Sequence, residues 1–187
     1  SMAEESWGPQ VAPVDWGSQE REAFRREFLD AAGLVRPDGA ERRQALCISV
    51  EDAGGLGDDV PAPATSFQEL GVLPRYALEG LQSCGIISPM PVQAQALPIV
   101  LSGQDVIGLA QTGSGKTLAF LLPSVVHVEA QSPLARNAAT PIVLVLAPTR
   151  ELAVQISDEA GKVLRYSRQS EQHPGGVWCT VVYGGGD

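Results

Sequence analysis

The chain has 187 residues, of which 44% are hydrophobic, and this length accommodates one globular domain with an appendage. Its formal net charge of −9 argues against a broad basic surface for nucleic acid. The sequence contains no apolar run near the ~20 residues of a membrane span and no secretory signal. Cys47, Cys84 and Cys179 form no CxxC motif or Cys/His cluster. This pattern supports neither a disulfide framework nor a zinc site. It predicts a reducing compartment, the nucleus or the cytoplasm.

Residues 1–64 are predicted to form an acidic N-terminal extension, because they carry thirteen acidic and six basic residues. The first part of this extension, residues 1–17, has no periodicity and favours disorder. A helix is predicted from Ser18, a suitable N-cap, to near residue 33. Its apolar stripe includes Phe24 and Phe28, and we interpret this stripe as a docking face for a protein partner.

The sequence pattern changes near residue 65. Before it, residues 45–50 are predicted to form a short strand, and the Gly-, Asp- and Pro-rich residues 53–63 a linker. In residues 65–187, helical and strand patterns alternate, which is typical of a parallel α/β sheet with flanking helices. The predicted helices span residues 74–84, 92–101, 115–129 and 149–166. The predicted strands span residues 105–110, 142–147 and 177–183, and the predicted sheet is truncated after the third strand.

Residues 110–117, Ala-Gln-Thr-Gly-Ser-Gly-Lys-Thr, lie between a predicted strand and a predicted helix, which is typical of a phosphate-binding loop. Gly113 and Gly115 permit a phosphate to approach the backbone closely. Lys116 can reach the β- and γ-phosphates of a nucleotide, and the Thr117 hydroxyl can ligate Mg²⁺. The alternative is a glycine-rich turn with an accidental Gly-Lys-Thr. The predicted nucleotide-binding residues of the loop are Thr112, Gly113, Ser114, Gly115, Lys116 and Thr117.

Four motifs together resemble the N-terminal part of DEAD-box ATP-dependent RNA helicases. Residues 85–93, Gly-Ile-Ile-Ser-Pro-Met-Pro-Val-Gln, are similar to the adenine-reading Q motif, and residues 110–117 have the loop form that this family uses. Residues 148–153, Pro-Thr-Arg-Glu-Leu-Ala, are similar to the RNA-contacting motif Ia. Residues 184–185 stand in the place of the family's glycine doublet. The resemblance implies a partial RecA-like P-loop NTPase domain in residues 65–187.

The resemblance implies that Gln93 and Phe67 bind the adenine of ATP. A glutamine amide offers a donor and an acceptor to the adenine edge, and a phenylalanine ring stacks on the base. The alternatives are a solvated helix residue for Gln93 and ordinary core packing for Phe67. Ile86 and Met90 stand where the family usually has an aromatic residue and a threonine, so we expect modest ATP affinity.

The resemblance also implies contacts with the sugar–phosphate backbone of RNA, made by Pro148, Thr149, Arg150, Gly184 and Gly185. The Thr149 hydroxyl and the amides that begin the next helix can hold a phosphate. Arg150 either contacts a phosphate or braces the loop by pairing with an acid. The two glycines either allow the RNA backbone to come close or form a plain turn.

The sequence contains no Asp-Glu-Ala-Asp motif, so Lys116 and Thr117 are the only catalytic residues that the resemblance identifies. We expect this chain to bind ATP or ADP with Mg²⁺, and neither to hydrolyse ATP nor to unwind RNA. An intact helicase of this kind would couple ATP hydrolysis to local RNA unwinding or to remodelling of RNA–protein particles. Unpaired sheet edges predict self-association. Two alternatives stay open: another P-loop nucleotide-binding enzyme, and a non-catalytic interaction module built on the acidic arm.

Overall fold

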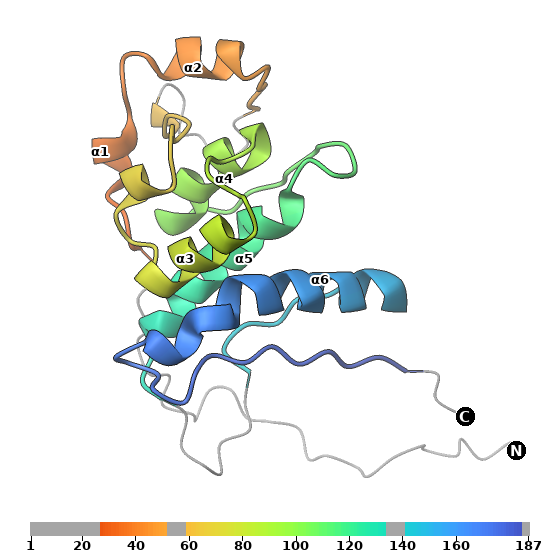
Figure 1. The fold of residues 1–187 in the computed structure, drawn as a ribbon. Coiled ribbons are helices and arrows are strands. Elements are labelled where there is room, and N and C mark those ends of the chain that lie inside the picture. Colours follow the sequence, from red (N-terminus) through yellow and green to blue (C-terminus); the bar gives the residue numbers. More distant parts are fainter. Residues whose placement is uncertain (1–26, 52–58, 134–140, 185–187) are drawn as a thin grey trace, which may run out of the picture.

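The computed structural model describes residues 27–51, 59–133 and 141–184. Figure 1 shows α3, α4 and α5 packed together, with α6 crossing beside them. In this described part, no helix is long and apolar enough to cross a membrane. The helices are α1 (Ala31–Leu34), α2 (Gly39–Ala45), η2 (Gln68–Leu70), α3 (Arg75–Ser83), α4 (Pro91–Leu101), α5 (Lys116–Glu129), α6 (Arg150–Val163) and η3 (Leu164–Gln169).

The four long helices, α3 to α6, lie where the sequence predicts helices, and their starts have clear local causes. The Gln93 side chain accepts a hydrogen bond from the Met90 N–H at 3.0 Å, which fixes the first turn of α4. The Thr149 hydroxyl accepts from the Leu152 N–H at 3.2 Å and caps α6. The helix predicted at 149–166 changes to a 3₁₀ helix at Leu164, where η3 begins.

One hydrophobic core joins α3, α4 and α5 to the C-terminal end of α6. Leu97 of α4 and Leu122 of α5 are fully buried in it, and burial of such a side chain stabilises the fold by about 1.5–3 kcal/mol. Leu118, in the first turn of α5, also belongs to this core. The core therefore fixes the helix that follows the phosphate-loop sequence against α4. The other large core residues are Phe67, Leu70, Leu73, Tyr76, Leu81, Leu101, Val125, Val126 and Val163.

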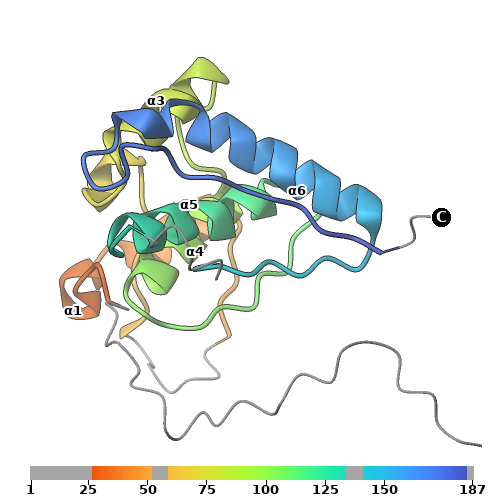
Figure 2. The ribbon, with the colours of Figure 1, turned by 90° about the horizontal axis from the view of Figure 1, so that it is seen from below.

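The three predicted strands are absent from the described part of the chain, which contains no β-strand. Residues 105–110, 142–147 and 177–183 are non-helical, and no backbone–backbone hydrogen bond joins one of these segments to another. Figures 1 and 2 show the last of them running along α6. A strand needs a neighbour whose backbone groups complete the ladder, and apolar sequence alone does not supply one. The predicted parallel sheet is therefore not formed here.

The N-terminal extension also differs from the prediction. Residues 18–26 lie outside the described residues, and residues 27–30 are not helical, because Asp30 accepts the Ala32 N–H at 3.1 Å and starts α1. Residues 45–50 form no strand, because α2 extends to Ala45 and a turn follows it. Residues 60–63, at the end of the predicted linker, are buried. The boundary between residues 64 and 65 stays a prediction.

Candidate functional site

The phosphate-loop sequence forms a turn that leads directly into α5. Gly115 is the N-cap of α5 with φ of 82°, and Gly113 has φ of 79°. Both angles lie in the left-handed region, which favours glycine. A Cβ at Gly113 would meet nothing within 4 Å, whereas a Cβ at Gly115 would lie 2.2 Å from Gln93 Nε2. Gly113 thus leaves open space beside the loop, and Gly115 allows α4 to approach it.

The Lys116 ammonium group bonds to the loop itself. Its Nζ donates to the carbonyl oxygens of Ala110 and Gln111, the latter at 2.6 Å. The Ser114 Oγ of the same loop is buried and has no hydrogen-bond partner among the described residues. A bound phosphate would supply acceptors that compete with the two carbonyls for Lys116. The loop therefore offers one cation, bonded to loop carbonyls, and one unsatisfied hydroxyl to an anion.

Gln93 lies against the loop and is 1% exposed. Its Nε2 donates to the Gly115 carbonyl oxygen at 3.0 Å, while its Oε1 accepts from the Met90 N–H. Both ends of the amide are thus occupied by protein groups, and little of it is accessible to a base. In the structure Gln93 bridges the start of α4 and the loop. The contact with adenine stays a prediction, and the alternative of a solvated helix residue is wrong because the side chain is buried.

Phe67 differs from the predicted adenine-stacking role. The side chain is 2% exposed and lies in the hydrophobic core with Leu70 and Leu97. A ring with no exposed face cannot stack on a ligand without unpacking its neighbours. The structure therefore gives Phe67 the core-packing role that the sequence left as the alternative.

The predicted RNA-binding residues lie at the N-terminal end of α6. Pro148 and Thr149 are exposed and precede the helix. Arg150 stacks on Tyr183, with its guanidinium carbon 4.3 Å from the ring centroid, and its Nη2 donates to the Tyr183 hydroxyl at 3.3 Å. This contact brings motif Ia beside Gly184, which follows Tyr183 in the chain. Gly185 lies outside the described residues.

Arg150 is braced by an aromatic residue, whereas the brace that the sequence left open beside a phosphate contact was an acid. A guanidinium group above a tyrosine ring is attracted by the electrons of the ring face. Because the ring carries no net charge, the guanidinium charge stays available to an anion. Sequence reasoning missed Tyr183, because 33 residues separate it from Arg150. An aromatic residue directly before the glycine doublet was the signal that could have drawn attention to it.

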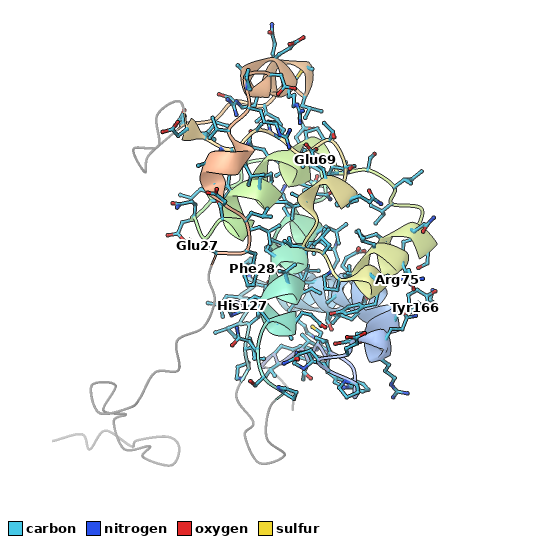
Figure 3. All side chains as sticks on the ribbon, turned by 90° about the vertical axis from the view of Figure 1, so that its left-hand side faces the viewer. Glu27, Phe28, Glu69, Arg75, His127 and Tyr166 are labelled. Carbon is cyan, nitrogen blue, oxygen red and sulfur yellow. The ribbon has the colours of Figure 1, made fainter. Side chains whose placement is uncertain are left out.

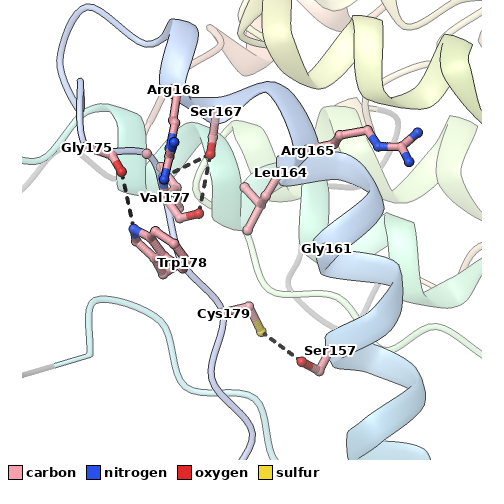
Figure 4. Close-up of a pocket in the computed structure, with 11 residues that line it drawn as sticks. Ser157, Gly161, Leu164, Arg165, Ser167, Arg168, Gly175, Val177, Trp178 and Cys179 are labelled. Carbon is pink, nitrogen blue, oxygen red and sulfur yellow. Dashed lines mark hydrogen bonds between the residues drawn. The ribbon is translucent and has the colours of Figure 1, made fainter.

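A pocket of about 360 Å³ lies at the other end of α6, away from these residues (Figure 4). It lies between α6, η3 and the segment that begins at Gly175, and Trp178, 77% exposed, lies at its side. The pocket contains none of the predicted site residues. No group of three or more His, Cys, Asp or Glu side chains suited to a metal ion occurs in the described part of the molecule.

Comparisons with known proteins agree with the motifs. The DEAD/DEAH box helicase family model matches residues 90–183, about half of the chain. DEAD-box ATP-dependent RNA helicase 20 of Oryza sativa subsp. japonica is 44% identical over 162 residues, which cover 87% of this chain and 30% of the relative. The chain thus spans about a third of the length of the curated relatives that it matches.

Two solved structures are also similar. The yeast DEAD-box splicing factor Prp28 is 32% identical with a TM-score of 0.61, over 72% of this chain and 30% of that chain. The RNA helicase Prp28 of Chaetomium thermophilum, solved bound to ADP, is 35% identical with a TM-score of 0.59, over 75% of this chain and 32% of that chain. These similarities support the predicted RecA-like P-loop fold class. The chain belongs to the DEAD/DEAH box helicase family.

Proposed function

We propose that this chain is the nucleotide-binding part of an ATP-dependent RNA helicase. The single observation that carries the proposal is the glycine-containing turn at Gly113 and Gly115, which leads into the N-terminus of α5. The Lys116 ammonium group bonds to a carbonyl oxygen of the same loop. Such a turn at a helix N-terminus binds phosphate through backbone amides and the helix dipole. Residues 65–187 would belong to the first RecA-like domain, preceded by the extension of residues 1–64.

The residues of the loop fit a nucleoside phosphate with Mg²⁺. Open space lies beside Gly113, and the buried Ser114 hydroxyl has no partner in the described part of the chain. Lys116 would leave the loop carbonyls to contact the β- and γ-phosphates, and Thr112 and Gly115 would contribute backbone amides. The Thr117 hydroxyl would be the protein ligand of Mg²⁺, and the phosphates would provide further ligands. When bound, the ion neutralises charge on the phosphates.

RNA would bind near Thr149, Arg150 and Gly184 through its sugar–phosphate backbone. The stacking on Tyr183 holds the Arg150 guanidinium in place without neutralising its charge. Contacts of this kind fix the position of the RNA and carry no sequence information. In the whole helicase, ATP binding and hydrolysis would drive local RNA unwinding or remodelling of RNA–protein particles. We place the protein in the nucleus or cytoplasm, because its three exposed cysteines are free thiols.

The protein-interaction alternative is less favoured, because Phe28 of the predicted docking face packs within the molecule. The Phe28 ring meets His127 of α5 edge-on, with a centroid distance of 6.3 Å, and the Phe28 side chain packs against the core (Figure 3). Phe24 lies outside the described residues. The alternative of a different P-loop enzyme has no support from the family match.

Isothermal titration calorimetry tests the proposal. The chain should bind ADP and ATP in the presence of Mg²⁺, and Lys116→Ala should weaken binding by about tenfold or more, because a charge-assisted contact to phosphate is lost. Arg165→Ala, in the pocket away from the loop, is the matched control for loss of a positive charge. A wild-type chain that binds neither nucleotide would disprove the proposal.

A further inference from the structure

Pro98, in the middle of α4, leaves one backbone acceptor of the helix unused. Proline has no N–H, so the carbonyl of residue i−4, here Ala94, receives no intrahelical hydrogen bond from it. The N-terminal extension supplies the missing donor: the Ala64 N–H donates to the Ala94 oxygen at 2.9 Å. The proline therefore creates a docking point for the extended segment that precedes Thr65.

The residue after Ala94 provides a second contact with the same segment. Gln95 is 7% exposed, and its Nε2 donates to the Pro61 carbonyl oxygen at 2.8 Å. Residues 60–64, which we call the clamp segment, are all buried. Gln93 and Gln95 lie two positions apart, about 200° around the helix, so they point to different sides. The first turns of α4 are thus held by the phosphate loop through Gln93 and by the clamp segment through Gln95.

The clamp segment is itself anchored by basic side chains of α2. Arg42 donates to the Pro63 carbonyl oxygen at 3.1 Å and pairs with Asp38 at 2.8 Å and with Glu69 at 3.5 Å. Arg43 donates to the Pro61 carbonyl oxygen at 3.4 Å. The segment therefore has fixed partners on both sides, α2 on one and α4 on the other.

The extension also holds the opposite end of α4. The backbone N–H groups of Phe28 and Leu29 both donate to the Leu101 carbonyl oxygen, at 2.8 and 3.0 Å. Leu101 is the last residue of α4, where carbonyls have no intrahelical donor. Figure 3 shows Phe28 beside His127, so the same segment also contacts α5. Residues 28–29 and the clamp segment thus contact α4 near its two ends.

We propose that the clamp segment positions Gln93, and through it Gly115, for nucleotide binding. Pro98 and Gln95 are positioning residues in this arrangement, because the hydrogen bonds that depend on them join α4 to the clamp segment. If the clamp segment loosens, α4 can shift and the Gln93–Gly115 hydrogen bond is lost, although every loop residue is intact. This inference rests on the proposed function, because the loop must bind a nucleotide for its positioning to affect affinity.

Pro98→Ala is the sharpest test, because it favours α4 as a helix and at the same time weakens the contact of α4 with the clamp segment. An alanine N–H at residue 98 competes with Ala64 for the Ala94 oxygen, while the substitution favours the helical conformation of α4 itself. We expect faster hydrogen exchange of the Ala64 amide and of the Gln93 side-chain amide, measured by NMR. We also expect ADP affinity to fall about three- to tenfold. Pro123→Ala is the matched control, because it changes an internal proline of α5, and no backbone hydrogen bond joins α5 to the clamp segment in the described part of the chain.

Gln95→Met is the second variant, since methionine keeps the size of the side chain and removes the donor to Pro61. Gln82→Met, at an exposed position of α3, is its control. The inference would be overturned if exchange at Ala64 became faster while the ADP affinity and the exchange at Gln93 stayed unchanged. The clamp segment would then hold α4 without positioning Gln93. If the wild-type chain binds no ADP, the proposed function fails and the inference fails with it. If the wild type binds ADP and neither variant changes its ADP affinity, the inference alone fails.

Discussion

The Gln93 side chain donates to the Gly115 carbonyl oxygen at 3.0 Å, and this hydrogen bond joins the start of α4 to the glycine-containing turn before α5. The contact requires glycine at residue 115, since a Cβ there would lie 2.2 Å from Gln93 Nε2 and 2.9 Å from Met90 Sδ. The Q-motif residues and the loop therefore pack on each other through a position where no side chain fits.

The two loop glycines should differ sharply when each is changed to alanine. Gly113→Ala adds only the strain of a positive φ, about 1 kcal/mol, because a Cβ there meets nothing within 4 Å. Gly115→Ala adds a similar strain and a collision with buried Gln93, so we expect a loss of about 2–4 kcal/mol in the free energy of unfolding. Urea denaturation measures both. Equal losses would contradict the packing described above.

Replacement of Gln93 separates a bridging role from adenine reading. Gln93→Ala removes the hydrogen bonds to Met90 and Gly115, so the loop loses its support whichever base is bound. We expect the affinities for ATP and GTP to fall by a similar factor, about fivefold or more. Calorimetry with both nucleotides measures this. A loss confined to ATP would instead restore the adenine-reading role that the sequence predicts.

The long helices could be predicted from the sequence because their signals are local. Pro74 precedes α3, Pro91 begins α4, Gly115 precedes α5 and Thr149 caps α6. Each signal acts within a few residues of the helix end, where the chain neighbours decide the backbone conformation. The turn at Gly113 and Gly115 was predictable for the same reason, since its glycines and the helix that follows lie in one short stretch.

The remaining features depend on residues far apart in the chain, which a single sequence does not reveal. The buried clamp segment has the composition of a linker, and only its contacts with Ala94 and Gln95 hold it in place. Tyr183 beneath Arg150 follows from the course of residues 177–184 along α6. The apolar runs at 105–110 and 142–147 have the composition of strands, but the structure has no strand there. A strand requires a neighbouring segment to pair with, and composition does not reveal that neighbour.

Arg150 and Tyr183 should affect RNA binding in different ways. Arg150→Ala removes a cation that would contact phosphate, so affinity for a labelled oligouridylate should fall and the salt dependence of log Kd should drop by about one unit. Tyr183→Ala keeps the charge of Arg150 and removes the ring that holds it in place. The affinity for RNA should therefore fall less than in Arg150→Ala, and the salt dependence should stay unchanged. Fluorescence anisotropy at several salt concentrations measures both.

Tyr183→Phe keeps the ring that stacks on Arg150 and removes only the hydroxyl, which makes it the matched control. Its effect should be smaller than that of Tyr183→Ala. If Arg150→Ala leaves both the affinity and the salt dependence unchanged, Arg150 is a structural brace and makes no contact with RNA.

Glu69 should make the stability of the extension depend on pH. Burial acts to raise the pKa of Glu69, but hydrogen bonds from Thr65 and the charges of Arg42 and Arg36 outweigh it, so the pKa lies below its usual 4.5. A lowered carboxyl pKa stabilises the folded state above pH 4.5, and this contribution is lost as the pH falls through the folded pKa.

Glu69→Gln removes this contribution, so the variant should be less stable than the wild type at neutral pH by about 1 kcal/mol. The difference should shrink as the pH falls below about 4.5. Urea denaturation from about pH 7 to about pH 3 measures the two curves. Thr65→Val, which removes one of the hydrogen bonds to Glu69, should give an intermediate slope. Parallel curves for wild type and Glu69→Gln would contradict this assignment.

The exposed apolar side chains of the three unpaired segments should cause self-association. Leu109, Leu146 and Val182 are 93%, 85% and 88% exposed, and unpaired extended backbone readily pairs with another chain. Light scattering should give a mass that rises above the 19.7 kDa of the monomer with concentration. The double variant Leu109→Lys/Leu146→Lys should shift the protein towards monomer, whereas Gln44→Lys/Gln82→Lys, at exposed helical positions, adds the same charge and should not. A monomeric wild type at every concentration would mean that these segments cover their apolar groups within one molecule.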